Sequence, residues 1–291
     1  MTPLNDQNLH KPICLITGAT EGVGKATASE LISRGFTVVL AARNAAKADE
    51  VKAEIKATTG GEVDIILADL TSLKTVHQLS ETFKRRYPRL DVLINNAGIF
   101  VPTRKVTEDG FEASYQVNYL SHFLLTHLLI DELKKSEQGR IVNLSSSVYT
   151  VGKFDAQNLQ SEKRFSVMGA YAASKLFMLL FSVDLAERLE ETPITVNAAH
   201  PGIARTQMML RAPGMFKVVS YLALPFSVSP EKGAATSVYL ASSPEIATVS
   251  GRYFTSCKPT AIKSKFNTET IRRHLWEKSA EGLQRLGLMH A

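Results

Sequence analysis

Short apolar runs rich in valine and isoleucine recur along the 291-residue chain, with longer helix-like segments between them. Most of these runs are almost continuously apolar, as expected for strands that are covered on both faces of a sheet. Seven runs predict strands, at 13–17, 37–42, 63–68, 92–95, 140–145, 195–199 and 251–255. Strands that alternate with helices favour right-handed crossovers and a mainly parallel sheet. The pattern therefore predicts an α/β fold of the doubly wound, Rossmann type.

The segments between the runs predict helices, and no linker divides the chain. Helix-like stretches cover 22–34, 45–58, 73–86, 110–135 and 171–191, and the tail 269–286 has an amphipathic pattern. Because no internal repeat, low-complexity tract or flexible linker interrupts the sequence, we predict one domain over 1–291. The segment 204–229 is rich in Met, Phe and Leu and follows a predicted strand. We interpret it as a substrate lid, with ordinary packing against the sheet as the alternative.

Charge and composition exclude several classes of function. The formal net charge is +6, but the basic residues are scattered and the longest cluster, 84–86, is typical of a solvated helix end, so we expect no nucleic-acid partner. The dispersed histidines predict no metal site, and two cysteines form no disulfide framework, which favours a reducing compartment. Residues 1–11 are polar, and the apolar stretch 214–226 is too short to span a bilayer. We therefore expect a cytoplasmic protein with no signal peptide, membrane anchor or transmembrane segment.

A glycine-rich turn follows the first predicted strand and opens the first predicted helix. Gly18, Gly22 and Gly24 stand in a G-x-x-x-G-x-G spacing, with Val23 between the last two. Glycines here allow a tight turn and close approach of the backbone to a pyrophosphate, which a helix N-terminus stabilises. The pattern predicts that these four residues bind a dinucleotide, and a purely structural turn is the alternative.

The end of the second predicted strand discriminates between NAD and NADP. A carboxylate there would bond the ribose 2′-hydroxyl and repel a 2′-phosphate, but the strand 37–42 is followed by Arg43. Since a guanidinium can bind a phosphate with two parallel hydrogen bonds, we predict NADP(H) as the cofactor. An arginine that merely faces solvent is the alternative.

Polar residues also follow the third and fourth predicted strands, at the sheet edge where open α/β folds bind ligands. Asp69 and Leu70 follow the third strand, where a carboxylate could reach an adenine, and Asn95 begins the sequence Asn-Asn-Ala-Gly. We predict that Asp69, Leu70 and Asn95 contact the cofactor. The alternative for each motif is a polar loop residue that caps the next helix.

Tyr171 and Lys175 lie four residues apart at the start of a predicted helix, so they share one face. A free tyrosine has a pKa of about 10, which is too high for a base near neutral pH, and a nearby ammonium lowers it. Serines 145–147 end the fifth strand, where a hydroxyl could donate to a substrate carbonyl oxygen. Asn118, in the helix after the fourth strand, either satisfies a helix kink or holds a water in a proton relay.

The sequence resembles the short-chain dehydrogenase/reductase family over essentially its full length, because the motifs of that family occur here in the same order. The motifs are Thr-Gly-x-x-x-Gly-x-Gly at 17–24, Asn-Asn-Ala-Gly at 95–98, the helix asparagine, the strand-end serine, Tyr-x-x-x-Lys at 171–175 and Pro-Gly at 201–202. The resemblance implies that Ser146 orients the carbonyl, with Ser145 as the second choice. It also implies that Tyr171 is the acid/base, and that Lys175 binds the nicotinamide ribose and lowers the tyrosine pKa.

The same resemblance assigns three further residues. Asn118 matches the relay asparagine of the family, and Ile203 and Thr206 match positions that contact the nicotinamide carboxamide and the phosphates. Within the family the chain is most similar to the retinol dehydrogenases, with the oxidoreductase domain of WW-domain proteins as a neighbour. One reason is the interval between Ser146 and Tyr171, 25 positions (171 − 146), which is longer than the common family spacing. Many retinol dehydrogenases have an N-terminal membrane anchor, so the expected absence of one argues against a microsomal retinoid role.

Together these features predict an NADP(H)-dependent carbonyl reductase or alcohol dehydrogenase. We expect it to interconvert a carbonyl and an alcohol on an apolar small molecule, with reduction favoured. A catalytically silent NADP(H)-binding regulatory protein is one alternative, and a protein that contacts membranes peripherally through 204–229 and the basic tail is another. The resemblance also leaves open a homodimer through the helices that carry Asn118 and Tyr171.

Overall fold

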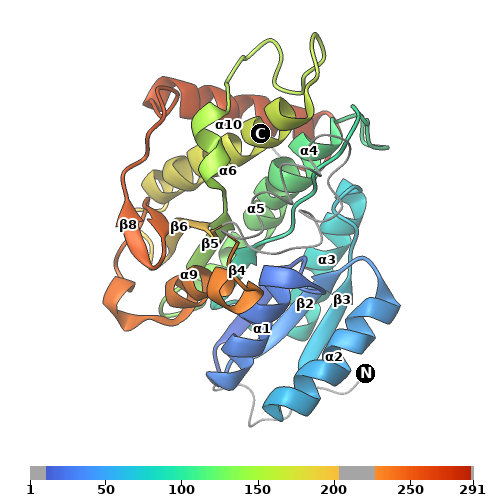
Figure 1. Cartoon of the computed structure of the whole chain (residues 1–291), viewed down its shortest axis with the longest axis vertical. Helices are drawn as coiled ribbons and strands as arrows, with labels where there is room; N and C mark the ends of the chain where they lie inside the picture. The colour runs from blue at the N-terminus through green and yellow to red at the C-terminus, as the bar shows by residue number, and fades with distance from the viewer. Residues whose placement is uncertain (1–10, 203–226, 290–291) are drawn as a thin grey trace.

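The computed structural model describes residues 11–202 and 227–289 (Figure 1). One eight-stranded sheet crosses this part of the chain in the order β3-β2-β1-β4-β5-β6-β7-β8. The strands are β1 (Ile13–Thr17), β2 (Thr37–Ala42), β3 (Val63–Leu67), β4 (Val92–Asn95), β5 (Arg140–Leu144), β6 (Thr195–His200), β7 (Tyr253–Thr255) and β8 (Lys258–Thr260). All pairs are parallel except β7 with β8. This confirms the doubly wound fold, and its order reverses between β1 and β4, at the edge where ligands bind.

The central strands are buried on both faces, which explains their continuous apolar sequences. In β1, Leu15 packs in the core on one face of the sheet, whereas Cys14 and Ile16 pack in the core on the other. Successive side chains of a strand point to opposite faces of the sheet, so alternate residues of β1 enter two separate cores. The prediction of seven strands was one too low, because β8 has only three residues and all of them are exposed.

Helices cover both faces of the sheet (Figure 1). One core packs beneath α1 (Gly22–Ser33), α2 (Ala45–Thr59) and α9 (Pro230–Ser242). The other packs beneath α3 (Leu73–Arg86), α5 (Ser121–Lys134) and α6 (Val167–Arg188). Of the described helices, α6 alone is long and apolar enough to cross a membrane by length and composition. Its apolar side chains, including Leu176 and Phe177, are buried in the core, and this position accounts for its composition.

The C-terminal helix α10 (Glu269–Gln284) packs against α5 and α6. The Trp276 ring lies edge-on to Phe123 of α5, with 5.0 Å between the ring centroids. On α6, the guanidinium carbon of Arg188 lies 3.8 Å from the ring centroid of Trp276. The Arg272 side chain, which is 8% exposed, donates to both carboxylate oxygens of Glu187 at 2.6 and 2.8 Å. Aromatic contacts and an ion pair in which one arginine nitrogen bonds both carboxylate oxygens therefore fix α10 on the outer face of these two helices.

The predicted helix 110–135 consists of three shorter elements. They are α4 (Ala113–Tyr115), the π-helical turn η2 (Gln116–Leu120) and α5. Gly110 has φ +86°, and the Glu112 carboxylate accepts hydrogen bonds from the backbone N–H groups of Ser114 and Tyr115. The helix therefore begins after Glu112 rather than at Gly110. The 3-10 turns η3 (Ser147–Val151) and η5 (Pro244–Ile246) complete the described elements.

Candidate active site

The glycine-rich turn between β1 and α1 has the conformation that its sequence requires. Gly18 and Gly22 have φ +66° and +56°, in the left-handed region that other residues avoid. A Cβ on Gly18 would lie 2.7 Å from the Ala97 Cα, and one on Gly24 would lie 2.5 Å from the Gly18 carbonyl oxygen. These glycines let the turn pack directly against the segment that follows β4.

Side-chain hydrogen bonds tie this turn to the neighbouring strand end. The Thr17 hydroxyl oxygen accepts from the backbone N–H groups of Asn96 and Ala97, both at 3.0 Å. The Asn96 side-chain amide donates to the carbonyls of Thr17 and Gly18 at 2.7 and 2.9 Å. The roles of Thr17 and Asn96 were not predicted, although both belong to motifs that the sequence displays.

The start of α1 fits a dinucleotide pyrophosphate. Its N-cap residue Glu21 makes no side-chain cap hydrogen bond, and the first turn, which includes Val23, contains no acidic residue. The backbone N–H groups of a first helical turn have no partners within the helix, and the helix dipole favours an anion beside them. Because the glycines of the turn leave these N–H groups accessible, the start of α1 can hold the two phosphates of a dinucleotide.

Arg43 lies directly after β2 and is exposed, with no hydrogen bond or ion pair within the described ranges.

Asp69 is half-buried after β3, and its Oδ1 accepts from the Thr71 N–H and hydroxyl, both at 2.9 Å. Leu70 is buried, and its carbonyl accepts from the Ser121 hydroxyl at 2.7 Å. The Asp69 side chain thus shapes the loop that leads into α3, and Arg43 presents a guanidinium at the same edge of the sheet.

The Asn95 side chain lies in the core and away from the sheet edge. It is 1% exposed, and its amide nitrogen donates to Asn143 and Thr126 at 2.7 and 3.0 Å. Any contact of Asn95 with a cofactor must therefore come from its backbone. The physical reason is the strand period, which directs the Asn95 side chain into the interior between β4, β5 and α5.

Tyr171 and Lys175 occupy one face of the N-terminal part of α6, as predicted. The helix begins after the N-cap residue Ser166, whose hydroxyl accepts from the Gly169 N–H at 3.1 Å. The Lys175 side chain is buried, and its Nζ donates to the Leu144 carbonyl at 2.9 Å, at the end of β5. The same Nζ lies 5.8 Å from the centroid of the Tyr171 ring. The β5 strand end therefore holds the ammonium beside the tyrosine.

Burial dominates the ionisation of this pair. It raises the pKa of Tyr171 to about 12 and lowers the pKa of Lys175 to about 8. The expected lowering of the tyrosine pKa by the lysine is therefore not found in the described chain. The reason is desolvation, which disfavours the phenolate and the ammonium alike. Below its pKa the Tyr171 phenol is protonated, as a proton donor to a carbonyl oxygen must be.

The structure separates the roles of the two serines at the end of β5. The Ser145 hydroxyl is buried and donates to the Lys175 backbone carbonyl at 2.8 Å, so it joins β5 to α6. Ser146 is half-buried at the start of η3, and within the described part of the chain its Oγ makes one hydrogen bond, accepted from the Val148 N–H at 3.5 Å. Its hydroxyl proton is thus free to orient toward a substrate, which favours Ser146 as the carbonyl-orienting residue.

Asn118 lies in the π-helical turn η2 and is fully buried. Its Oδ1 accepts from the Ile99 N–H at 2.7 Å, and its Nδ2 donates to the Ile99 carbonyl at 3.0 Å and to the Ser174 hydroxyl at 2.9 Å. The side chain therefore joins the segment after β4 to α6 and has no remaining donor for a relay. Any relay role falls to its backbone carbonyl, since a π-helix changes the hydrogen-bond pattern of its carbonyls.

An aromatic side chain that was not predicted borders the site. The Phe100 ring meets the Tyr171 ring edge-on, with 5.3 Å between the centroids and an interplanar angle of 76°. Its position two residues after the Asn-Asn-Ala-Gly motif was the only available signal. Ile203 and Thr206, together with residues 204–226 of the expected lid, lie outside the described residues.

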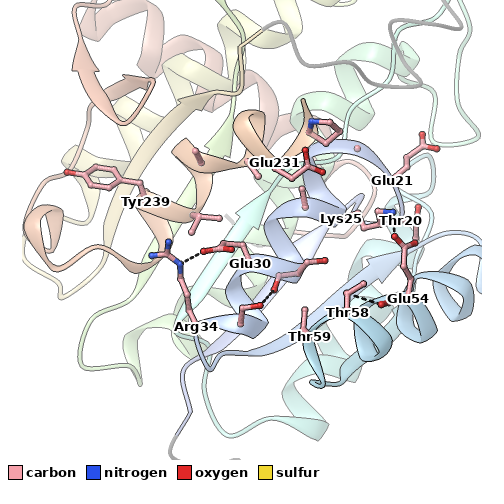
Figure 2. Close-up of a pocket in the computed structure, with 18 of the residues that line it drawn as sticks. Thr20, Glu21, Lys25, Glu30, Arg34, Glu54, Thr58, Thr59, Glu231 and Tyr239 are labelled. Atoms are coloured by element: carbon pink, nitrogen blue, oxygen red, sulfur yellow. Dashed lines mark hydrogen bonds and ion pairs between the residues drawn. The ribbon is translucent and has the colours of Figure 1, made fainter. Parts of the chain in front are cut away.

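A groove of about 950 Å³ starts at the glycine-rich turn and continues along α1 between α2 and α9 (Figure 2). Its walls carry ion pairs, among them Lys25 with Glu54 at 2.7 Å and Arg34 with Glu30 at 2.9 Å. Tyr171, Lys175 and Ser146 do not line it. The groove therefore lies apart from these three side chains, and most of its charged residues are paired with one another.

Comparisons with known proteins agree with this geometry. The sequence model described as short chain dehydrogenase matches residues 12–213. Human retinol dehydrogenase 14 is 42% identical over 289 residues, covering 92% of this chain and 85% of that protein. Human retinol dehydrogenase 12 is 38% identical over 270 residues, with the same coverage of 92% and 85%.

Solved structures show the same fold. A protein from Mycobacterium paratuberculosis has a TM-score of 0.75 at 28% identity, covering 97% of this chain and 98% of that chain. A short chain dehydrogenase from Shigella flexneri 2a, solved in complex with NADP, has a TM-score of 0.68 at 26% identity. It covers 87% of this chain and 100% of that chain.

Proposed function

Because the chain belongs to the short-chain dehydrogenase family, we propose that it is an NADP(H)-dependent oxidoreductase acting on an apolar carbonyl or alcohol, with reduction favoured. Family membership supports a dehydrogenase or reductase with a nicotinamide cofactor that supplies or accepts the hydride. The cofactor form, the direction and the substrate class are the proposed parts. The observation that carries the proposal is the Tyr171 and Lys175 pair at the C-terminal edge of β5.

In the direction of reduction, the Tyr171 hydroxyl donates a proton to the carbonyl oxygen. The raised pKa of Tyr171 keeps this proton in place until negative charge develops on the oxygen. Ser146 supplies a second hydrogen-bond donor to the same oxygen. Burial lowers the pKa of Lys175 to about 8, so near neutral pH its ammonium can supply a proton that replaces the one donated by Tyr171.

The decisive variant is Tyr171→Phe, which removes one oxygen and keeps the ring that Phe100 contacts. We expect turnover of an aldehyde to fall by a factor on the order of 10² to 10⁴, because general acid catalysis is lost. NADPH affinity, measured by fluorescence titration, should stay within about threefold of wild type. Undiminished turnover in the variant would overturn the mechanism.

A catalytically silent regulatory protein would behave differently. It would bind NADPH and show no turnover with any member of a panel of retinal, steroid, quinone and medium-chain aldehyde substrates. The names of the retinol dehydrogenase relatives and the aromatic wall formed by Phe100 support an apolar substrate for this chain.

Arg43 supports NADP(H) because it follows β2 directly and has no carboxylate partner within the described ranges. The NADP complex of the related Shigella flexneri protein is consistent with this choice. We expect Arg43→Gln to raise the KM for NADPH roughly tenfold to a hundredfold, because it removes charge-assisted hydrogen bonds to the 2′-phosphate. The KM for NADH serves as the control and should change little. Equal effects on both cofactors would contradict 2′-phosphate binding by Arg43.

A further inference from the structure

His122 is a fully buried histidine that the proposed mechanism does not use. It lies in the first turn of α5, four residues after Asn118, and its side chain points toward β1. Its Nε2 lies 2.9 Å from the Thr17 hydroxyl oxygen. Its Nδ1 is buried and has no hydrogen-bond partner among the described residues.

The hydrogen bonds around Thr17 determine which ring nitrogen carries the proton. The hydroxyl oxygen accepts from two backbone N–H groups, those of Asn96 and Ala97, which occupy both of its lone pairs. Its single proton can then go to His122 Nε2 at 2.9 Å or to the Ile94 carbonyl at 3.5 Å. The shorter contact is the stronger one, so Nε2 is the acceptor and Nδ1 carries the hydrogen.

We infer that His122 is a positioning residue: its Nδ1–H tautomer accepts the Thr17 hydroxyl and so holds the glycine-rich turn against the helix that carries Asn118. When its own proton is directed to His122, the Thr17 hydroxyl keeps both lone pairs toward the Asn96 and Ala97 N–H groups. His122 is the buried group that supplies that acceptor from the opposite side of the turn.

Its surroundings keep the ring neutral. Burial is the largest cause that lowers the pKa of His122, to about 3, and the positive charge of Lys175 acts in the same direction. A neutral ring can accept at one nitrogen and donate at the other, whereas a protonated ring could only donate. Through Nε2 the neutral ring therefore joins the start of α5 to Thr17, at the end of β1.

Two amide variants test which end of the ring matters. Glutamine places a polar atom near the position of Nε2, and asparagine places one near Nδ1. His122→Gln should bind NADPH within about threefold of wild type, whereas His122→Asn should bind it about tenfold more weakly, because the Thr17 proton loses its buried acceptor. The effect should appear in the dissociation constant of NADPH more than in kcat. Equal affinity in the two variants would overturn the inference.

A double-mutant cycle with Thr17→Val provides the second test. Once the hydroxyl is gone, replacing His122 by asparagine should cause little further loss of NADPH affinity, so the two effects should not add. Thr17→Ser, which keeps the hydroxyl, is the matched control and should behave like wild type. Strictly additive losses would show that the two side chains act separately.

The tautomer itself can be measured without any cofactor. Nitrogen-15 NMR of the histidine rings in the full chain should show Nδ1 protonated and Nε2 unprotonated for His122. This inference rests on the proposed function only for its effect on NADPH affinity. If wild type failed to bind NADPH, the proposed function would fail while the tautomer result still stood, and a proton on Nε2 would overturn the inference regardless of activity.

Discussion

At the scale of single residues, desolvation of Lys175 links the site to stability. Its side chain is 4% exposed, and burial lowers its pKa from 10.5 to about 8. Between these two values the unfolded chain holds a proton on this lysine that the folded chain has released. Folding stability attributable to Lys175 therefore rises with pH across the window from about 8 to 10.5.

Lys175→Met removes this titration and keeps a side chain of similar length. We expect the free energy of unfolding of wild type minus that of Lys175→Met to increase by roughly 3 kcal/mol between pH 7 and pH 10.5, since a shift of one pKa unit corresponds to ~1.4 kcal/mol. Urea unfolding of both proteins at the two pH values gives the difference. A difference that is constant with pH would show that the lysine titrates normally.

The two serines at the end of β5 should respond in opposite ways to removal of the hydroxyl. Ser146→Ala should lower kcat strongly while the free energy of unfolding stays within about 0.5 kcal/mol, because among the described residues the Ser146 side chain makes one long hydrogen bond. Ser145→Ala should cost ~1 kcal/mol of stability, because its buried bond to the Lys175 carbonyl is lost. Urea unfolding and aldehyde turnover, measured on both variants, compare them directly. The reverse pattern would restore Ser145 as the carbonyl-orienting residue.

At the scale of helices and strands, hydrophobic periodicity predicted the sheet well and the helix ends less well. The first six strands were recovered to within one residue at each end, because buried parallel strands are continuous apolar runs. The helix α9 was missed because its buried residues are mostly small, such as Ala234 and Ser237. Its start did carry a signal, since Ser229 caps the helix, Pro230 begins it and Glu231 follows.

The proximity of the two proposed catalytic side chains was easier to predict than the contacts that hold them. Tyr171 and Lys175 share a face because their spacing matches a helical turn, a local property that sequence displays directly. The hydrogen bond between Thr17 and His122 joins segments that are far apart along the chain. The hydrogen bond between Asn118 and Ile99 starts from a π-helical turn. Such contacts depend on the tertiary arrangement, which periodicity alone does not specify.

The attachment of α10 can be tested at its aromatic anchor. Trp276→Ala removes a half-buried ring that contacts Phe123 and the Arg188 guanidinium, and we expect the free energy of unfolding to fall by about 2 kcal/mol. Leu286→Ala, at a side chain that is 43% exposed, is the control and should change stability by less than about 0.5 kcal/mol. Similar losses in both variants would contradict the anchor role of Trp276.

At the scale of the whole molecule, α10 bears on the homodimer that the resemblance left open. A dimer through the helices that carry Asn118 and Tyr171 would need the outer faces of α5 and α6, and α10 of the same chain already covers them. We expect any dimer of this protein to use another surface. Hydrogen exchange in α5 and α6 should be unchanged when the protein is diluted, and size-exclusion chromatography with light scattering gives the mass. Loss of protection in α5 and α6 upon dilution would show that α10 moves aside.

The short final strand has a consequence for behaviour at high concentration. All three residues of β8 are exposed, and Pro259, opposite Phe254, has no N–H to offer a neighbouring backbone. Lys258 adds a charge at the same margin of the sheet. Such an edge resists pairing with a strand from another molecule, so this side of the protein is protected against the edge-to-edge aggregation to which open sheets are prone.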